Sequence, residues 1–198
     1  NEGVKILFGR DYYNEEILGL KFRVNAFSFF QTNIEAVERL YSEALALIPD
    51  LDSKVVYDLY CGTGTISQLM ASKAKKVYGI EIVQDSVDAA IDNAKMNNID
   101  NCHFICGDVK AKLDEVTEKP DMIVVDPPRM GMHDKVVEML ASYGIEQILY
   151  ISCNPNTMAM NLEKFSELGY EPVVMKAYDN FPKTKHVELV TLLSRTTL

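Results

Sequence analysis

Strand-length apolar runs alternate with segments of helical spacing through most of this 198-residue chain, and this alternation constrains its fold more than any other feature. The runs lie at residues 55–60, 77–82, 103–106, 122–125 and 148–151. Helical spacing of apolar residues covers residues 65–74, 86–97, 134–143 and 157–168. Strands that are apolar almost throughout are typically buried on both faces, so the pattern predicts a parallel β-sheet with helices on each face.

The N-terminal part departs from this alternation. Residues 4–8 and 20–24 alternate apolar with polar side chains, and the turn-forming Asn14 lies between them. This predicts a β-hairpin or an edge-strand arm. Helical spacing then covers residues 33–48, and Pro49 lies just past the end of that helix.

The C-terminal part departs from it as well. Residues 173–178 and 187–193 have the composition of strands, with no convincing helix between them. We therefore expect a β-hairpin arm at residues 1–30 and an α/β domain at residues 31–198. Its mostly parallel, seven-stranded sheet should end in an antiparallel hairpin.

The net charge of the chain and the length of its apolar runs limit which classes of function it can have. The net charge is −9, from 20 Lys and Arg against 29 Asp and Glu, which argues against bulk electrostatic binding of nucleic acid. A nucleic-acid substrate stays open, because a local patch such as Lys183 and Lys185, or a region outside this sequence, could supply cations. No apolar stretch approaches the roughly 20 residues of a membrane span, so we expect no membrane contact.

The four cysteines are scattered, at Cys61, Cys102, Cys106 and Cys153. They form neither a disulfide framework nor a C-x-x-C pair, and their spacing is not that of a metal site. This usage predicts a reducing, cytoplasmic environment and no metal. The start at Asn1, without an initiating Met, suggests a fragment of a longer chain.

A glycine loop follows the first apolar run, in the sequence D-L-Y-C-G-T-G at residues 58–64. Gly62 and Gly64 allow a tight turn and close approach of a ligand. The next strand ends in Glu81, which is placed to accept hydrogen bonds from ribose hydroxyls, and the third ends before Asp108, which is placed to receive the adenine amine. The loop is not the G-x-G-x-x-G of pyrophosphate binding, so a nucleoside without pyrophosphate, such as S-adenosylmethionine (SAM), fits better than NAD.

The fourth strand runs into D-P-P-R at residues 126–129, where the prolines stiffen a loop at the mouth of the crevice. Asp126 is a candidate for binding polar groups of cofactor or substrate. The alternative is a capped turn in which Arg129 is an ion-pair partner.

Cys153 follows the fifth strand in S-C-N-P, at the edge where α/β enzymes keep their chemistry. A buried core cysteine is the alternative interpretation. Glu188 lies in an otherwise apolar strand. It is either solvated on an edge strand, or buried with a raised pKa that suits proton abstraction. His186 could orient Glu188, contact the substrate or be structural.

These segments together resemble the RNA uracil-C5 methyltransferase family. The matching motifs are F-F-Q-T-N at 29–33, D-L-Y-C-G-T-G at 58–64, D-P-P-R at 126–129, S-C-N-P at 152–155 and F-P-x-T-x-H-V-E at 181–188. They occur in the family's order, and the last two together are highly specific for it. The resemblance implies the Rossmann-like fold of class I SAM-dependent methyltransferases.

The resemblance also implies roles for individual residues. Gln31, Tyr60, Glu81 and Asp126 match the family's SAM-binding positions, with Gly62 and Asp108 added from the loop and the general methyltransferase pattern. Cys153 matches the nucleophile and Glu188 the general base. Phe29 lies where an aromatic ring could stack on a flipped base.

The implied activity is SAM-dependent methylation of C5 of a uridine in RNA, either rRNA or tRNA, through a covalent bond between the cysteine and C6. RNA cytosine-C5 methylation is an alternative that S-C-N-P fits poorly, and a non-catalytic SAM- or RNA-binding module is another. Family members commonly carry an N-terminal RNA-binding region or an iron–sulfur cluster. Neither is in this sequence, so the arm is interpreted as the remnant of such a region.

Overall fold

The computed structural model describes residues 7–25 and 30–196. Its main sheet comprises β3 (Val55–Leu59), β4 (Lys76–Glu81), β5 (Cys102–Cys106), β6 (Met122–Val125), β7 (Gln147–Ser152), β8 (Tyr170–Tyr178) and β9 (Glu188–Arg195). The spatial order is β5-β4-β3-β6-β7-β9-β8. The first five strands pair in parallel, while β9 is antiparallel to both β7 and β8. The expected seven-stranded sheet with an antiparallel end is confirmed.

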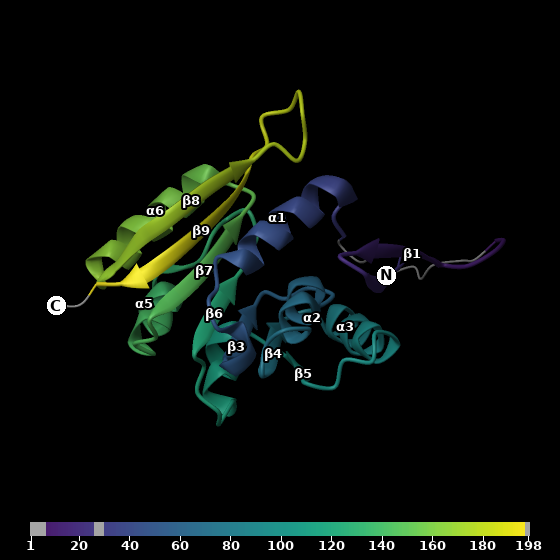
Figure 1. Ribbon diagram of the computed structural model, residues 1–198, viewed down its shortest axis with the longest axis horizontal. Helices are drawn as coiled ribbons and strands as arrows, with labels where there is room; N and C mark the ends of the chain where they lie inside the picture. Colours follow the sequence, from purple (N-terminus) through teal and green to yellow (C-terminus); the bar gives the residue numbers. More distant parts are fainter. Residues whose placement is uncertain (1–6, 26–29, 197–198) are drawn as a thin grey trace.

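Helices cover both faces of this sheet (Figure 1). The helices are α1 (Ile34–Ala46), α2 (Thr65–Ala71), α3 (Gln84–Met96), α4 (Val109–Lys112), α5 (Asp134–Ser142) and α6 (Pro155–Glu167), with short 3-10 turns at Leu51–Ser53 and Leu113–Glu115. Apolar side chains of α1 and α2 form one core cluster with one face of the sheet, while those of α4, α5 and α6 form a second cluster with the other face. All five side chains of β3 are buried, because both faces of this central strand are covered. The sequence pattern did not predict α4 or the two 3-10 turns.

The N-terminal arm is a two-stranded antiparallel hairpin of β1 (Tyr12–Ile17) and β2 (Leu20–Asn25). The expected turn at Asn14 is wrong, since Asn14 lies within β1 and pairs with Arg23. The chain instead reverses at Leu18 and Gly19, whose φ angles of 49° and 82° are those that two-residue hairpin turns require. The expected strand at 4–8 is also misplaced: its first three residues lie outside the described part of the chain, and Leu7 and Phe8 are exposed and precede β1.

Buried Ile17, Phe22 and Val24 of the arm belong to the same core cluster as α1. Within the described residues, no helix has both the length and the apolar content needed to cross a membrane.

Candidate active site

Five of the expected site residues lie at the carboxyl edge of the sheet. Tyr60 follows β3, Glu81 ends β4, Asp126 follows β6 and Cys153 follows β7. Glu188 begins β9, and since β9 runs antiparallel to β7, its start lies at the same edge. Parallel strands bring residues distant in sequence to one crevice in this way.

Cys153 and Glu188 are cross-strand neighbours. Ser152 of β7 pairs with Leu189 of β9, and extending this register by one residue places Cys153 opposite Glu188. The carboxylate of Glu188 raises the pKa of the Cys153 thiol, which agrees with their lying near one another. The sheet therefore brings a thiol and a carboxylate close together.

Glu188 is buried, with only 6% of its surface exposed. Burial raises the pKa of its carboxyl above the usual value, and the charge of Arg129 opposes that rise. The alternative of a solvated residue on an edge strand is thus excluded, because β9 lies between β7 and β8. A carboxylate with a raised pKa is the better proton acceptor.

Cys153 is partly exposed, in contrast to buried Cys61 and Cys102. Burial raises the pKa of the Cys153 thiol, the carboxylates of Glu188 and Asp126 raise it further, and Arg129 lowers it. The thiol form therefore predominates near neutral pH, and a positive charge brought close to these carboxylates would favour the thiolate.

Alkylation of Cys153 should report this electrostatic coupling. We expect Glu188→Gln to lower the pKa of Cys153, because the neutral amide removes the charge that disfavours the thiolate. The pH profile of iodoacetamide labelling should move to lower pH, with a several-fold faster reaction near neutrality, since one pKa unit changes the thiolate fraction about tenfold. Mass spectrometry of the Cys153 peptide measures the rate. Glu146→Gln, an exposed position at the other end of β7, should leave the profile unchanged; identical profiles for both variants would contradict the coupling.

Arg129 contacts His186 rather than a carboxylate, with 3.1 Å between its Nη2 and the imidazole Nδ1. A guanidinium only donates, so Nδ1 is the acceptor in this contact. The backbone carbonyl of Arg129 accepts hydrogen bonds from Asn154 Nδ2 at 2.9 Å and Thr157 Oγ1 at 3.2 Å. The D-P-P-R loop is thus fastened to the segment that follows Cys153.

The glycine loop is held against the end of β4. Tyr60, Gly62 and Gly64 have φ angles of 65°, 53° and 77°. The Gly62 N–H donates to Glu81 Oε2 at 3.0 Å, and the Val83 N–H donates to Glu81 Oε1 at 2.9 Å. Both oxygens of Glu81 are therefore fixed in place beside the loop.

Gly64 should tolerate alanine far worse than Gly62. A Cβ on Gly64 would lie 2.7 Å from the Phe104 ring and 2.9 Å from Ala90 Cβ, whereas a Cβ on Gly62 meets nothing within 4 Å. We expect Gly64→Ala to lower the free energy of unfolding by about 3 kcal/mol, from overpacking added to left-handed strain. Gly62→Ala carries only the strain of about 1 kcal/mol. Urea unfolding compares the two, and equal losses would contradict the packing argument.

Three acids near this edge of the sheet differ in their surroundings. Asp58 lies inside β3 and is fully buried. It accepts a hydrogen bond from Ser67 Oγ, while its Oδ1 has no hydrogen-bond partner among the described residues. Burial raises its pKa to about 7, and that of Asp126 to about 8, with Glu188 and Asp58 adding to the latter.

Asp108 is exposed and caps the N-terminus of α4. One of its carboxylate oxygens accepts hydrogen bonds from the Lys110 and Ala111 N–H groups, at 3.0 and 3.3 Å. Its second oxygen accepts no hydrogen bond from the described residues. The charge of Asp108 also raises the pKa of Tyr60, after burial, which places these two side chains near one another.

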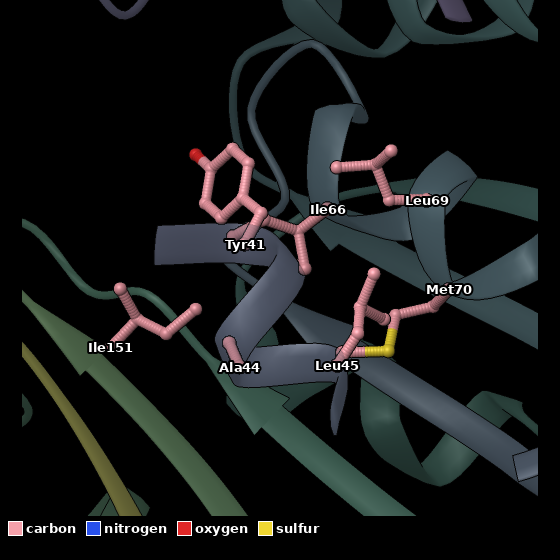
Figure 2. A pocket seen from close by; sticks show the side chains of 7 residues that line it. All are labelled: Tyr41, Ala44, Leu45, Ile66, Leu69, Met70 and Ile151. Atoms are coloured by element: carbon pink, nitrogen blue, oxygen red, sulfur yellow. The ribbon is translucent and has the colours of Figure 1, made fainter. Parts of the chain in front are cut away.

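Tyr41 of α1 is a buried residue near the acids of this edge, a position that sequence reasoning did not predict. Its pKa is raised first by burial and then by Asp126, with smaller contributions from Asp58 and Glu188, while the Gln31 side chain lowers it. Figure 2 shows Tyr41 beside the aliphatic side chains of α1, α2 and β7 that line a small apolar pocket, with its hydroxyl pointing away from Met70. Helical spacing alone marked Tyr41 as a core residue, and its position beside the acids carries no sequence signal.

Some sequence candidates lie elsewhere. Phe29 lies outside the described residues. Lys183 and Lys185 are exposed in the loop between β8 and β9. Among the described residues, no group of three or more His, Cys, Asp or Glu side chains could hold a metal ion.

Comparisons with known proteins show what this chain is similar to. A family model described as tRNA (Uracil-5-)-methyltransferase matches residues 1–119 and 108–196. A protein of Caldanaerobacter subterraneus named as an uncharacterized RNA methyltransferase is 50% identical over 194 residues, which are 98% of this chain and 43% of that protein. One from Clostridium acetobutylicum is 50% identical over 189 residues, 96% of this chain and 41% of its own length. The chain thus spans less than half the length of these relatives.

Two solved structures extend the comparison. The Pyrococcus abyssi tRNA (uracil-54, C5)-methyltransferase, in complex with S-adenosyl-L-homocysteine, is 30% identical with a TM-score of 0.80, over 94% of this chain and 45% of that one. Trm5b from Pyrococcus abyssi has a TM-score of 0.76 at 19% identity, over 94% of this chain and 56% of that one, which shows a shared fold.

Proposed function

The chain belongs to the tRNA (uracil-5-)-methyltransferase family, and from that premise we propose that it transfers a methyl group from SAM to C5 of a uridine in RNA. The observation that carries this proposal is the register that sets Cys153 opposite Glu188. A nucleophile and a proton acceptor on adjacent strands supply the two groups that the reaction needs. We assign residues 31–198 as the catalytic unit and residues 1–30 as an arm, and we place the reaction in the cytoplasm.

The residues proposed to hold SAM are Gln31, Tyr60, Gly62, Glu81, Asp108 and Asp126. The chemistry of the carboxyl edge suits this ligand, because SAM carries a sulfonium and an ammonium group. Asp126 is partly buried with a raised pKa, and the buried Asp58 Oδ1 has no partner among the described residues. A cationic ligand would compensate such carboxylates. The open space at Gly62 leaves room for a ligand to approach the backbone.

Uracil C5 is too weak a nucleophile to react unaided, and Cys153 is proposed to activate it. The thiolate attacks C6, the sulfur–carbon bond forms, and the electrons of the C5–C6 double bond move toward O4 to give an enolate. SAM, when bound, supplies an electrophilic methyl group and is converted to S-adenosylhomocysteine. Carbon C5 of the activated base accepts that methyl group.

Glu188 is proposed to complete the reaction. Its carboxylate takes the C5 proton, the electrons of that bond restore the C5–C6 double bond, and the bond between C6 and sulfur breaks. Cys153 leaves as a thiolate and is ready for another turnover. A uridine within folded RNA must first leave its stack to reach this site.

RNA that contains 5-fluorouridine tests the proposal. Fluorine at C5 cannot be removed as a proton, so a covalent complex of protein, RNA and methyl group should persist through denaturing electrophoresis. Its formation should require both SAM and Cys153. If the complex forms equally with Cys153→Ser, the nucleophile is a different residue.

The RNA itself is proposed to be tRNA or rRNA. The matching family is described as acting on tRNA, and so is the Pyrococcus abyssi enzyme, which supports the first of these. Nucleoside mass spectrometry of both RNA classes, from cells with and without the gene, separates them. Loss of 5-methyluridine from one class identifies the substrate.

A further inference from the structure

The outward face of the arm carries a cluster of cations. The register pairs Tyr12 with Asn25, Asn14 with Arg23 and Glu16 with Lys21, and side chains of opposed residues share a face. Phe22 and Val24 alternate with these residues and are buried on the opposite face. The exposed face of the arm is therefore the one that bears Tyr12, Asn14, Glu16, Lys21, Arg23 and Asn25, and Arg10 extends it.

Two guanidinium groups lie close to the Tyr12 ring on this face. The Cζ atom of Arg23 is 4.3 Å from the centre of the Tyr12 ring, and that of Arg10 is 5.1 Å away. Arg10, Lys21 and Arg23 are exposed, and Glu16 is the one acid of the paired residues on this face. An excess of positive charge here stands out on a chain with a net charge of −9.

Two side chains, one from α3 and one from the residue that follows it, hold the free edge of β2 in place. Asn97 accepts from the Lys21 N–H at 2.9 Å and donates to the Lys21 carbonyl at 2.8 Å. Asn93 accepts from the Arg23 N–H at 2.8 Å and donates to the Arg23 carbonyl at 3.5 Å. The two amides pair with β2 as a neighbouring strand would, so the backbone that carries Lys21 and Arg23 is fixed while their side chains reach solvent.

We propose that this basic face of the arm (Arg10, Tyr12, Lys21 and Arg23) binds single-stranded RNA outside the nucleotide that is methylated. Guanidinium and ammonium groups suit phosphates, and an aromatic ring next to arginine planes suits an unstacked base. The inference rests on the proposed function, since it takes RNA as the substrate. The face would contribute to RNA affinity and not to the chemical step.

Binding of a fluorescein-labelled oligouridylate of about 12 nucleotides to the 198-residue chain tests this inference. We expect Arg10→Ala/Arg23→Ala to raise the dissociation constant about tenfold, and to reduce the slope of log affinity against log salt by roughly 1.4 units, as the loss of two phosphate contacts predicts for a single strand. Tyr12→Ala should weaken binding several-fold with the slope unchanged. Thermal unfolding checks that each variant is folded.

The matched control is Lys73→Ala/Lys119→Ala, which removes two exposed cations near the amino ends of β4 and β6. It should bind as the unmodified chain does. The inference would be overturned if the two double variants bound the oligouridylate with the same affinity, whether both kept the affinity of the unmodified chain or both lost it. Absence of binding by the unmodified chain at low salt would overturn it as well. Methylation assays separate RNA binding by the arm from the proposed function. The variant Arg10→Ala/Arg23→Ala should keep the turnover number of the unmodified chain at saturating RNA. If the unmodified chain forms no 5-methyluridine in any RNA, methyl transfer is refuted and the binding result still stands.

Discussion

Replacing Cys153 with alanine is expected to abolish methyl transfer to RNA, with a fall in turnover of roughly 10⁴-fold or more. Alanine cannot form the bond to C6, and without that bond C5 has too little electron density to take the methyl group. Cys153 is the partly exposed thiol opposite Glu188, so other cysteines should not replace it. Transfer of radiolabelled methyl groups from SAM to unmodified tRNA and rRNA measures the loss.

The matched control is Cys106→Ala, because Cys106 is also partly exposed but lies at the end of β5. It should retain activity, and Cys153→Ala should bind SAM as the unmodified chain does. Substantial activity in Cys153→Ala would remove the covalent mechanism. Loss of SAM binding in that variant would mean that the substitution disturbs the cofactor site instead.

Replacing Glu188 with glutamine is expected to stop the reaction at a later point. The amide is nearly isosteric but cannot accept the C5 proton, so the methylated adduct should form and then fail to break down. Turnover should fall by roughly 10²- to 10⁴-fold, the usual contribution of a general base. A covalent protein–RNA complex should accumulate with ordinary uridine, without 5-fluorouridine, and migrate as a separate band on a denaturing gel.

Cys153→Ala should give no such band, and Glu146→Gln should turn over normally. The two active-site variants thus differ in kind: one fails before the bond to C6 forms and the other before that bond breaks. A Glu188→Gln chain that releases methylated RNA at the normal rate would show that another group takes the proton.

Local sequence patterns predicted most of the secondary structure. The buried strands β3, β6 and β7 read as apolar runs because both of their faces are covered, and the helices between them kept helical spacing. The position of Cys153 just after β7 followed from the same pattern. The turn of the arm was misplaced, because Leu18 is not a typical residue for positive φ and the cross-strand pairs outweigh the preference of Asn14.

Strand order and side-chain partners could not be predicted in this way. Nothing in residues 187–193 shows that β9 inserts between β7 and β8, yet this insertion buries Glu188 and sets it opposite Cys153. Likewise, Asp58 reads like a strand-end acid but is buried within β3. The acids near Tyr41, Asp126 and Glu188 among them, come from segments far away along the chain.

The sequence by itself determined which segments form strands and helices, that the sheet is mostly parallel, and that Cys153 follows a buried strand. These features depend on periodicities between residues that are near neighbours in the chain. Only the tertiary structure decided that Glu188 is buried next to Cys153, that Tyr41 lies near the acids at the carboxyl edge, and that the arm displays a basic face. Those results depend on which distant segments pack together, and the free energy of that packing is a property of the whole core.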